Sequence, residues 1–218
     1  MKQVLVLCLL VAATAAKADT SYVVVGAPDR LNAVPFWGQT YDAFRCQWLY
    51  YAADIGRSGR IVSVGVWGAP DAPATFYNAR YLFCHTNVTQ LSNQFAANYA
   101  GNTPTEVFAA DTLVVGDGPP ADWFTVPADF DYDNAKNLIV EIRWRGDAGL
   151  TANLYRRNVT HDYRRCFAYD DTAPSGFADT VPGNHIRFGF VTTSLAEPVQ
   201  YVVPAAPSPA ASVVRNVL

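Results

Sequence analysis

Apolar and polar residues alternate most regularly between positions 137 and 145. The even-numbered side of this segment is apolar, with Leu138, Val140, Ile142 and Trp144, and the odd-numbered side is mostly charged, with Ile139, Glu141, Arg143 and Arg145. A period of two places these two sets on opposite faces of an extended chain. The pattern therefore predicts a half-buried β-strand at 137–145, with one face in the core and a charged face in solvent.

Similar extended patterns recur along most of the chain. The segments that carry them are 21–25, 45–51, 60–67, 75–86, 105–115, 122–127, 137–145, 150–156, 165–169 and 185–191. Residues 91–99 have a helical pattern, residues 52–56 favour a single helical turn ended by Gly56, and the aspartate-rich residues 129–136 favour a tight turn. We expect an all-β fold: a single jelly-roll-like antiparallel β-sandwich of roughly nine or ten strands with one short helix.

The first residues have the pattern of an export signal. A basic start is followed by a short apolar run at 4–11, and Ala16-Lys17-Ala18 has the small-x-small form of a signal peptidase site, which predicts cleavage before Asp19. The apolar run is shorter than the roughly 20 residues that span a bilayer. We therefore expect residues 1–18 to be a signal peptide, no transmembrane segment after its removal, and a secreted, extracellular or cell-surface protein.

The remaining chain divides at the point where proline and alanine become frequent. Residues 19–195 carry the strand patterns and form the expected β-sandwich domain. Residues 196–218 form a Pro/Ala-rich tail, and this composition does not suit the interior of a sheet. The tail ends in an apolar, strand-like fragment at 212–218.

Charge argues against one class of partner. The chain has 16 basic and 19 acidic residues, a net charge of −3, and removal of the signal would take away Lys2 and Lys17 but no acidic residue. Proteins that bind nucleic acids neutralise phosphates with clustered lysine and arginine. We therefore expect no nucleic-acid partner.

Three cysteines remain after the expected cleavage: Cys46, Cys84 and Cys166. Because exported proteins meet oxidising conditions, we expect one disulfide and one leftover thiol, with a pairing that spacing does not reveal. His85 follows Cys84 directly and suggests a nucleophilic thiol. Neighbours on a strand point to opposite faces, however, so the two side chains would not touch there.

A series of short motifs follows a recognisable order. They are Pro35-Phe-Trp-Gly38, Arg45-Cys-Gln-Trp-Leu-Tyr50, Ile55-Gly56, Arg60-Ile-Val-Ser-Val64, Tyr81-Leu-Phe-Cys-His-Thr86, Thr105-Glu-Val-Phe108 and the stretch 130–141. In this order they resemble the extracellular β-sandwich modules of secreted and cell-surface bacterial proteins, which often occur beside type IX C-terminal sorting signals. The resemblance spans about residues 20–192 and implies a jelly-roll-like sandwich with a non-catalytic role in adhesion or extracellular structure. Cys46 and Cys84 depart from the pattern.

Asp129, Asp131 and Asp133 are candidate ligands of Ca²⁺. Their alternating spacing presents several carboxylates together, and this hard cation takes six to eight oxygen ligands. The glycine and terminal glutamate of an EF-hand loop are absent from this stretch. In the alternative interpretation the aspartates accept local backbone hydrogen bonds in a tight turn.

Aromatic residues are concentrated between positions 37 and 51, and Trp37, Tyr41 and Trp48 are the candidate ligand-binding residues among them. If the rings are exposed, they can stack on sugar rings or anchor a partner protein. If they are buried, they form the core at one end of the sandwich.

Two further patterns concern surface chemistry. Asn87-Val-Thr89 and Asn158-Val-Thr160 match the glycosylation acceptor motif, which makes Asn87 and Asn158 candidate sites. His161 and Asp162 leave a Ser/His/Asp arrangement open, but no nucleophile-elbow motif accompanies them.

These observations favour a protein that is not an enzyme: a secreted or cell-surface structural or adhesion protein. In a specific form of this hypothesis it is the subunit of an extracellular filament, in which residues 21–25 or 212–218 add a strand to the sheet edge of a neighbouring copy. The alternative is a carbohydrate-binding module that uses the aromatics at 37–51. The expected partners are other copies of the chain, other surface proteins or glycans, and no cofactor is expected apart from the candidate Ca²⁺.

Overall fold

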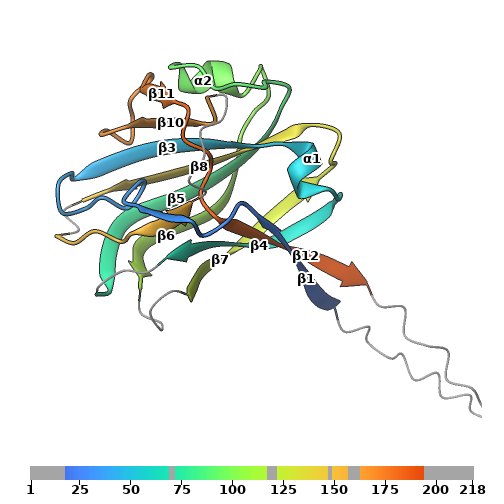
Figure 1. Cartoon of the computed structure of the whole chain (residues 1–218), viewed down its shortest axis with the longest axis horizontal. Helices are drawn as coiled ribbons and strands as arrows, with labels where there is room; N and C mark the ends of the chain where they lie inside the picture. Colours follow the sequence, from blue (N-terminus) through green and yellow to red (C-terminus); the bar gives the residue numbers. More distant parts are fainter. Residues whose placement is uncertain (1–17, 69–71, 117–121, 147–148, 157–162, 194–218) are drawn as a thin grey trace, which may run out of the picture. The chain divides into compact units, whose positions relative to one another are not determined.

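Two antiparallel β-sheets pack face to face (Figure 1). The structure is a computed structural model that describes residues 18–68, 72–116, 122–146, 149–156 and 163–193. Within these ranges, Ala18–Thr192 form one compact unit. Residues 1–17 and 194–218, which contain nearly all of the expected signal peptide and the whole expected tail, lie outside the described residues.

The elements of the described ranges confirm the all-β prediction. The strands are β1 (Ala18–Val25), β2 (Arg30–Asn32), β3 (Ala43–Tyr50), β4 (Gly59–Gly68), β5 (Ala74–Thr86), β6 (Thr105–Val115), β7 (Asp122–Tyr132), β8 (Asn137–Arg145), β9 (Leu154–Arg156), β10 (Arg165–Ala168), β11 (Phe177–Asp179) and β12 (Ile186–Thr193); the helices are α1 (Ala52–Ile55) and α2 (Phe95–Asn98). Each of the ten predicted strands is present in part or in full. β2 and β11 are additional, because three residues are too few to show a period of two.

The strand order defines the two layers. The first, which we call sheet A, has the order β1-β12-β4-β9-β2, with β7 also paired to β4. The second, sheet B, has the order β11-β10-β3-β8-β5-β6. β8 lies in the middle of sheet B, antiparallel to β3 on one side and to β5 on the other.

The inner faces of both sheets form the main core. Leu138, Val140, Ile142 and Trp144 of β8 are fully buried there, as the alternation predicts. They pack in the same cluster as Phe188 of β12 in sheet A. Each large apolar side chain buried in this way contributes about 1.5–3 kcal/mol relative to an exposed one.

The predicted turn at 129–136 is wrong in its first half, because β7 continues to Tyr132. Phe130 and Tyr132 are buried on its inner face, while Asp129 and Asp131 point outward. Apolar and polar residues therefore alternate here as in a strand. The sequence predicts a turn because aspartate is common in turns. Only the segment that begins at Asp133 turns the chain into β8.

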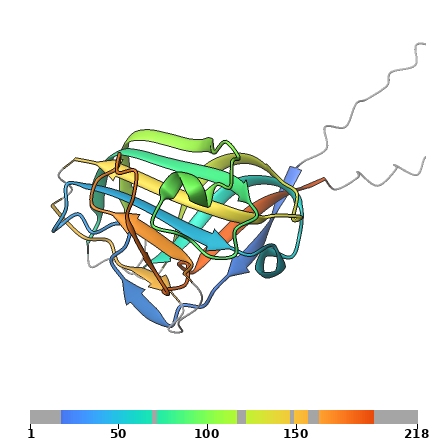
Figure 2. The ribbon, with the colours of Figure 1, turned by 90° about the horizontal axis from the view of Figure 1, so that it is seen from above.

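The predicted solvated face of β8 is wrong for its first half, although Arg143 is partly exposed and Arg145 is exposed. Ile139 and Glu141 are both fully buried, because a second layer of chain covers the outer face of sheet B. Figure 2 shows α2 lying across β3 and β8 on this face. The buried side chains of this second apolar cluster are Leu49, Cys84, Leu91, Phe95, Tyr99, Ile139, Cys166 and Ala168. The helix itself is shorter than the predicted segment 91–99.

Candidate functional site

Four aromatic side chains from distant parts of the chain meet at one end of sheet B. Trp37 and Tyr41 precede β3, Tyr169 follows β10, and Phe177 begins β11. Because β10 runs antiparallel to β3, the residues just before β3 and just after β10 lie at the same end of the sheet. We call these four residues the aromatic surface.

The rings of the aromatic surface are in direct contact. Tyr41 and Tyr169 are stacked, with ring centroids 3.8 Å apart and an interplanar angle of 9°. Trp37 meets Tyr41 edge-on at 5.3 Å, and Phe177 tilts against Tyr169 at 6.2 Å. Phe177 is 62% exposed, the highest value among the aromatic residues in the described ranges, and Tyr169 is 40% exposed. Partial burial and the neighbouring Tyr41 hydroxyl raise the pKa of Tyr169.

The aromatic surface rests on the core. Phe44 is fully buried, and its ring centroid lies 6.2 Å from that of Tyr41 and 5.6 Å from that of Tyr169. Phe167, which is half-buried, contacts Phe177 at 5.8 Å. These contacts hold the exposed rings in place before any ligand arrives, and this reduces the entropy that binding would cost.

Charged groups border the exposed rings. Asp170 follows Tyr169 and accepts hydrogen bonds of 2.8 Å from both the backbone nitrogen and the hydroxyl of Thr172, which lowers its pKa. Asp171 accepts a hydrogen bond of 2.7 Å from Nε of Arg145. Flat rings beside carboxylates and a guanidinium suit a ligand that has one apolar face and several hydroxyl groups.

The candidate aromatic residues have different fates. Trp37 and Tyr41 are half-buried and belong to the aromatic surface, but Trp48 is fully buried on the inner face of β3 and does not take part. The period of two explains this result, since Phe44, Trp48 and Tyr50 all point into the core. Sequence reasoning missed Tyr169 and Phe177, because only the pairing of β10 with β3 and β11 brings them to Tyr41.

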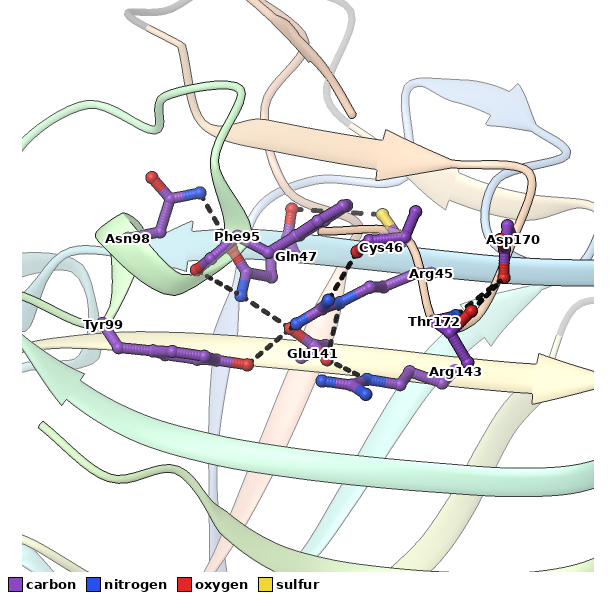
Figure 3. Close-up of polar contacts among 11 residues, drawn as sticks. Arg45, Cys46, Gln47, Phe95, Asn98, Tyr99, Glu141, Arg143, Asp170 and Thr172 are labelled. Atoms are coloured by element: carbon purple, nitrogen blue, oxygen red, sulfur yellow. Dashed lines mark hydrogen bonds and ion pairs between the residues drawn. The ribbon is translucent and has the colours of Figure 1, made fainter. Parts of the chain in front are cut away.

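Glu141 forms the centre of a buried polar network on the outer face of sheet B (Figure 3). Arg45 donates to its two oxygens at 3.1 and 3.2 Å, and Gln47 and Tyr99 donate to Oε2 at 2.6 and 2.5 Å. Arg143 also donates to Oε1. Burial, and then the negative charge of Glu141, raise the pKa of Tyr99 to about 12.

The network joins the covering layer to the sheet. Gln47 donates to the backbone oxygen of Phe95 at 3.2 Å and accepts a bond of 2.9 Å from Asn98, so both ends of α2 are attached to β3. Arg45 donates to the backbone oxygen of Ala173 at 2.7 Å, which fixes the loop before β11. Because Glu141 has no exposed surface, we assign it a structural role.

The expected disulfide is absent: Cys46, Cys84 and Cys166 are buried free thiols. Cys46 points into the main core, whereas Cys166 on the adjacent strand points into the second cluster. Cys84 on β5 is three strand spacings, about 14 Å, from β10 and two spacings, about 10 Å, from β3. Bridged cysteines have Cα atoms within about 7 Å, so the strand order excludes both pairings of Cys84. Cys46 and Cys166 lie on adjacent strands, but their side chains point to opposite faces of the sheet, which excludes the third pairing.

The candidate Ca²⁺ ligands do not converge. Asp129 forms two hydrogen bonds of 2.7 Å with Arg60, and Asp133 accepts bonds from the backbone nitrogens of Ala135 and Lys136 in the turn before β8. In the part of the chain that the structure describes, no three His, Cys, Asp or Glu side chains are grouped as metal ligands. Two of the three carboxylates are thus already engaged, that of Asp129 by Arg60 and that of Asp133 by the backbone of its own turn.

The remaining candidates are separate from one another. Nε2 of His85 lies 3.5 Å from Oδ1 of Asp133, and the imidazole ring stacks on Tyr132. The His85 side chain is on the face of β5 opposite to that of Cys84. Asn87 is exposed just after β5, as a glycosylation site must be. Asn158, His161 and Asp162 lie outside the described residues.

Comparison of the chain with protein-family models, with curated proteins and with solved structures gave no match. Among the residues that the structure describes, neither helix has the length and apolar character needed to cross a membrane.

Proposed function

We propose that this chain is a non-catalytic, secreted or cell-surface adhesion domain that binds glycans through the aromatic surface. The observation that carries the proposal is the stacked pair Tyr41–Tyr169 beside the highly exposed Phe177. Large exposed aromatic rings held in contact on the surface of a folded domain are typical of ligand-binding sites.

The chemistry of the aromatic surface favours a sugar. The apolar C–H face of a pyranose ring packs on an aromatic ring, and the hydroxyl groups around its edge need hydrogen-bond partners. Asp170, Asp171 and Arg145 offer such partners next to Tyr169. Since Phe44 and Phe167 already support the rings, little ordering is required on binding.

The proposal is tested by glycan-array screening, followed by titration calorimetry of the glycans that bind. Tyr169→Ala and Phe177→Ala should each weaken binding about tenfold or more, in line with the loss of a stacking partner. Tyr163→Ala is the matched control, because Tyr163 is 46% exposed but lies at the opposite end of β10. Wild-type binding by both aromatic-surface variants would overturn the proposal.

Assembly by strand addition is a second candidate. β6 ends sheet B as an edge strand of 11 residues, most of them at least partly exposed, and such an edge can pair with a strand of another molecule. β1 pairs with β12 of its own chain, so the expected donor at 21–25 is already engaged within its own sheet. Residues 212–218 are the other donor. Deletion of residues 204–218 should abolish filaments seen by electron microscopy, and filaments formed by the shortened chain would eliminate this candidate.

A further inference from the structure

A row of three residues crosses the outer face of sheet A. Arg187 of β12 is opposite Gly65 of β4, and Gly65 is opposite Thr125 of β7. The Arg187 side chain spans β4 and donates from Nη2 to the hydroxyl of Thr125 at 2.8 Å. A Cβ atom on Gly65 would lie 2.8 Å from that hydroxyl and 3.0 Å from Nε of Arg187. Glycine at this position therefore makes room for the guanidinium to cross the strand.

Aromatic rings hold the guanidinium in its position. Its central carbon lies 4.7 Å from the ring centroid of Tyr22 and 4.9 Å from that of Trp123, and cations are attracted to ring faces at such distances. Among the described residues, no carboxylate pairs with Arg187, whereas Arg45, Arg60 and Arg165 each have one. The site thus presents a positioned positive charge that forms no ion pair with the described residues.

A hollow of about 440 Å³ opens beside this guanidinium, at the side of β7 that faces β6. Trp123, Thr125 and Arg187 line it, together with Asp122 and the exposed Val114. Asp122 accepts a hydrogen bond from the backbone nitrogen of Trp123 through Oδ1. The volume is in the range of small-ligand sites, which is about 300–1,000 Å³.

We propose that this hollow binds a uronic acid residue of an acidic polysaccharide, with the sugar carboxylate on Arg187. The planar guanidinium offers paired donors that match a carboxylate. Thr125 and Asp122 accept hydrogen bonds from the sugar hydroxyls, and Val114 and Trp123 contact its C–H groups. Asp122 repels any anion in the hollow, and it repels a doubly charged phosphate more strongly than a singly charged carboxylate, which favours the carboxylate of the two.

The identification of the ligand as a sugar rests on the proposed glycan binding, but the site is separate from the aromatic surface. Arg187 belongs to sheet A, and the aromatic surface lies at the end of sheet B. Both sites can therefore be filled at once, so one domain would link two polysaccharide chains.

The test is calorimetric titration of the full chain with an oligogalacturonate and with its methyl ester, which has the same rings but no charge. The wild-type protein should bind the acid at least tenfold more tightly than the ester. Arg187→Gln should bind the two equally, and Arg187→Lys should fall between, because lysine keeps the charge but loses the planar pair of donors. This acid-to-ester ratio is a readout that simple loss of fold does not produce.

Arg57→Gln is the matched control. Arg57 also lies over a ring, at 4.6 Å from Phe190, and donates to a hydroxyl, that of Ser21, so its loss removes the same kinds of contact elsewhere. It should retain the wild-type preference for the acid. Circular dichroism of each variant checks that the fold is intact.

Three outcomes would overturn the inference. An unchanged acid-to-ester ratio in Arg187→Gln would exclude Arg187 as the carboxylate partner. If Tyr169→Ala lost galacturonate binding while Arg187→Gln retained it, the acidic sugar would be assigned to the aromatic surface, and the proposed function would stand. Displacement of the oligosaccharide by inorganic phosphate at the same concentration would reduce the site to an anion site without sugar recognition.

Discussion

Arg45 holds Glu141 in a buried ion pair, with Nε of the arginine 3.1 Å from Oε1 of the glutamate. The pair is diagonal, because Gln47 rather than Arg45 is the register partner of Glu141 across β3 and β8. The glutamate side chain has no exposure and the arginine side chain has 9%. Removing one partner of such a pair leaves the other charge buried and uncompensated.

We expect Glu141→Gln to destabilise the fold by about 3–5 kcal/mol, the usual cost of breaking a buried ion pair. Urea unfolding measures the change. The control is Asp129→Asn, which breaks the Arg60–Asp129 pair on the surface, where both side chains are more than half exposed. Exposed pairs contribute little, so the control should keep the wild-type midpoint. Equal midpoints for all three proteins would show that the network does not anchor the covering layer.

Tyr99 should make the stability of the fold depend on alkaline pH. Its pKa rises to about 12 in the folded state, first through burial and then through the charge of Glu141, while an unfolded tyrosine titrates near 10. The folded state therefore holds the proton more tightly, so this contribution is complete below pH 10 and is lost as pH rises from about 10 to 12. In urea unfolding, the stability difference between the wild type and Tyr99→Phe should shrink from pH 8 to pH 11. A constant difference would contradict the raised pKa of Tyr99 in the folded state.

The three buried cysteines should be unreactive thiols in the folded protein. Burial raises the pKa of Cys84 to about 11 and that of Cys166 to about 12, which suppresses the thiolate that reacts. With a chain that begins at residue 19, a thiol reagent at pH 8 should detect none of the three until urea is added, and then all three. Detection of a single thiol in urea without reductant would reveal a disulfide and contradict the positions of the three thiols in the structure.

Gly65→Ala should displace Arg187 from its position across β4. The new Cβ atom would approach the Thr125 hydroxyl to 2.8 Å, so either side chain must move. We expect a loss of about 1–3 kcal/mol, the usual cost of overpacking, and a changed NMR signal of the Arg187 guanidinium. Ser63→Ala, two residues away on the same face, adds no atom and should leave that signal in place. An unchanged signal in Gly65→Ala would show that the crossing does not depend on glycine.

Much of the fold is readable from local pattern. The alternation at 137–145 correctly predicts β8 and the four residues that it buries in the main core. Gly56 ends α1 with a left-handed φ of 71°, as the single predicted turn requires. Trp48 is four residues after Phe44 on β3, so the period of two places both side chains in the core. Its residue type alone makes Trp48 a candidate for the surface.

The candidate sites depend on contacts that no local pattern contains. Tyr41 meets Tyr169 because β10 pairs with β3, and Arg187 reaches Thr125 because β4 lies between β12 and β7. Nothing in the sequence near any one of these residues specifies its partner.

Residue types and their period of two were sufficient, by themselves, to determine that the chain forms strands and which side of each strand is apolar. Both follow from the geometry of a single extended chain. The tertiary structure alone decided that Ile139 and Glu141 on the outer face of β8 are buried, that distance or opposite orientation keeps the cysteines from bridging, and that four aromatic rings share one surface. The physical reason is that these features depend on strand order and on a covering layer, which are set by contacts between residues far apart in the sequence.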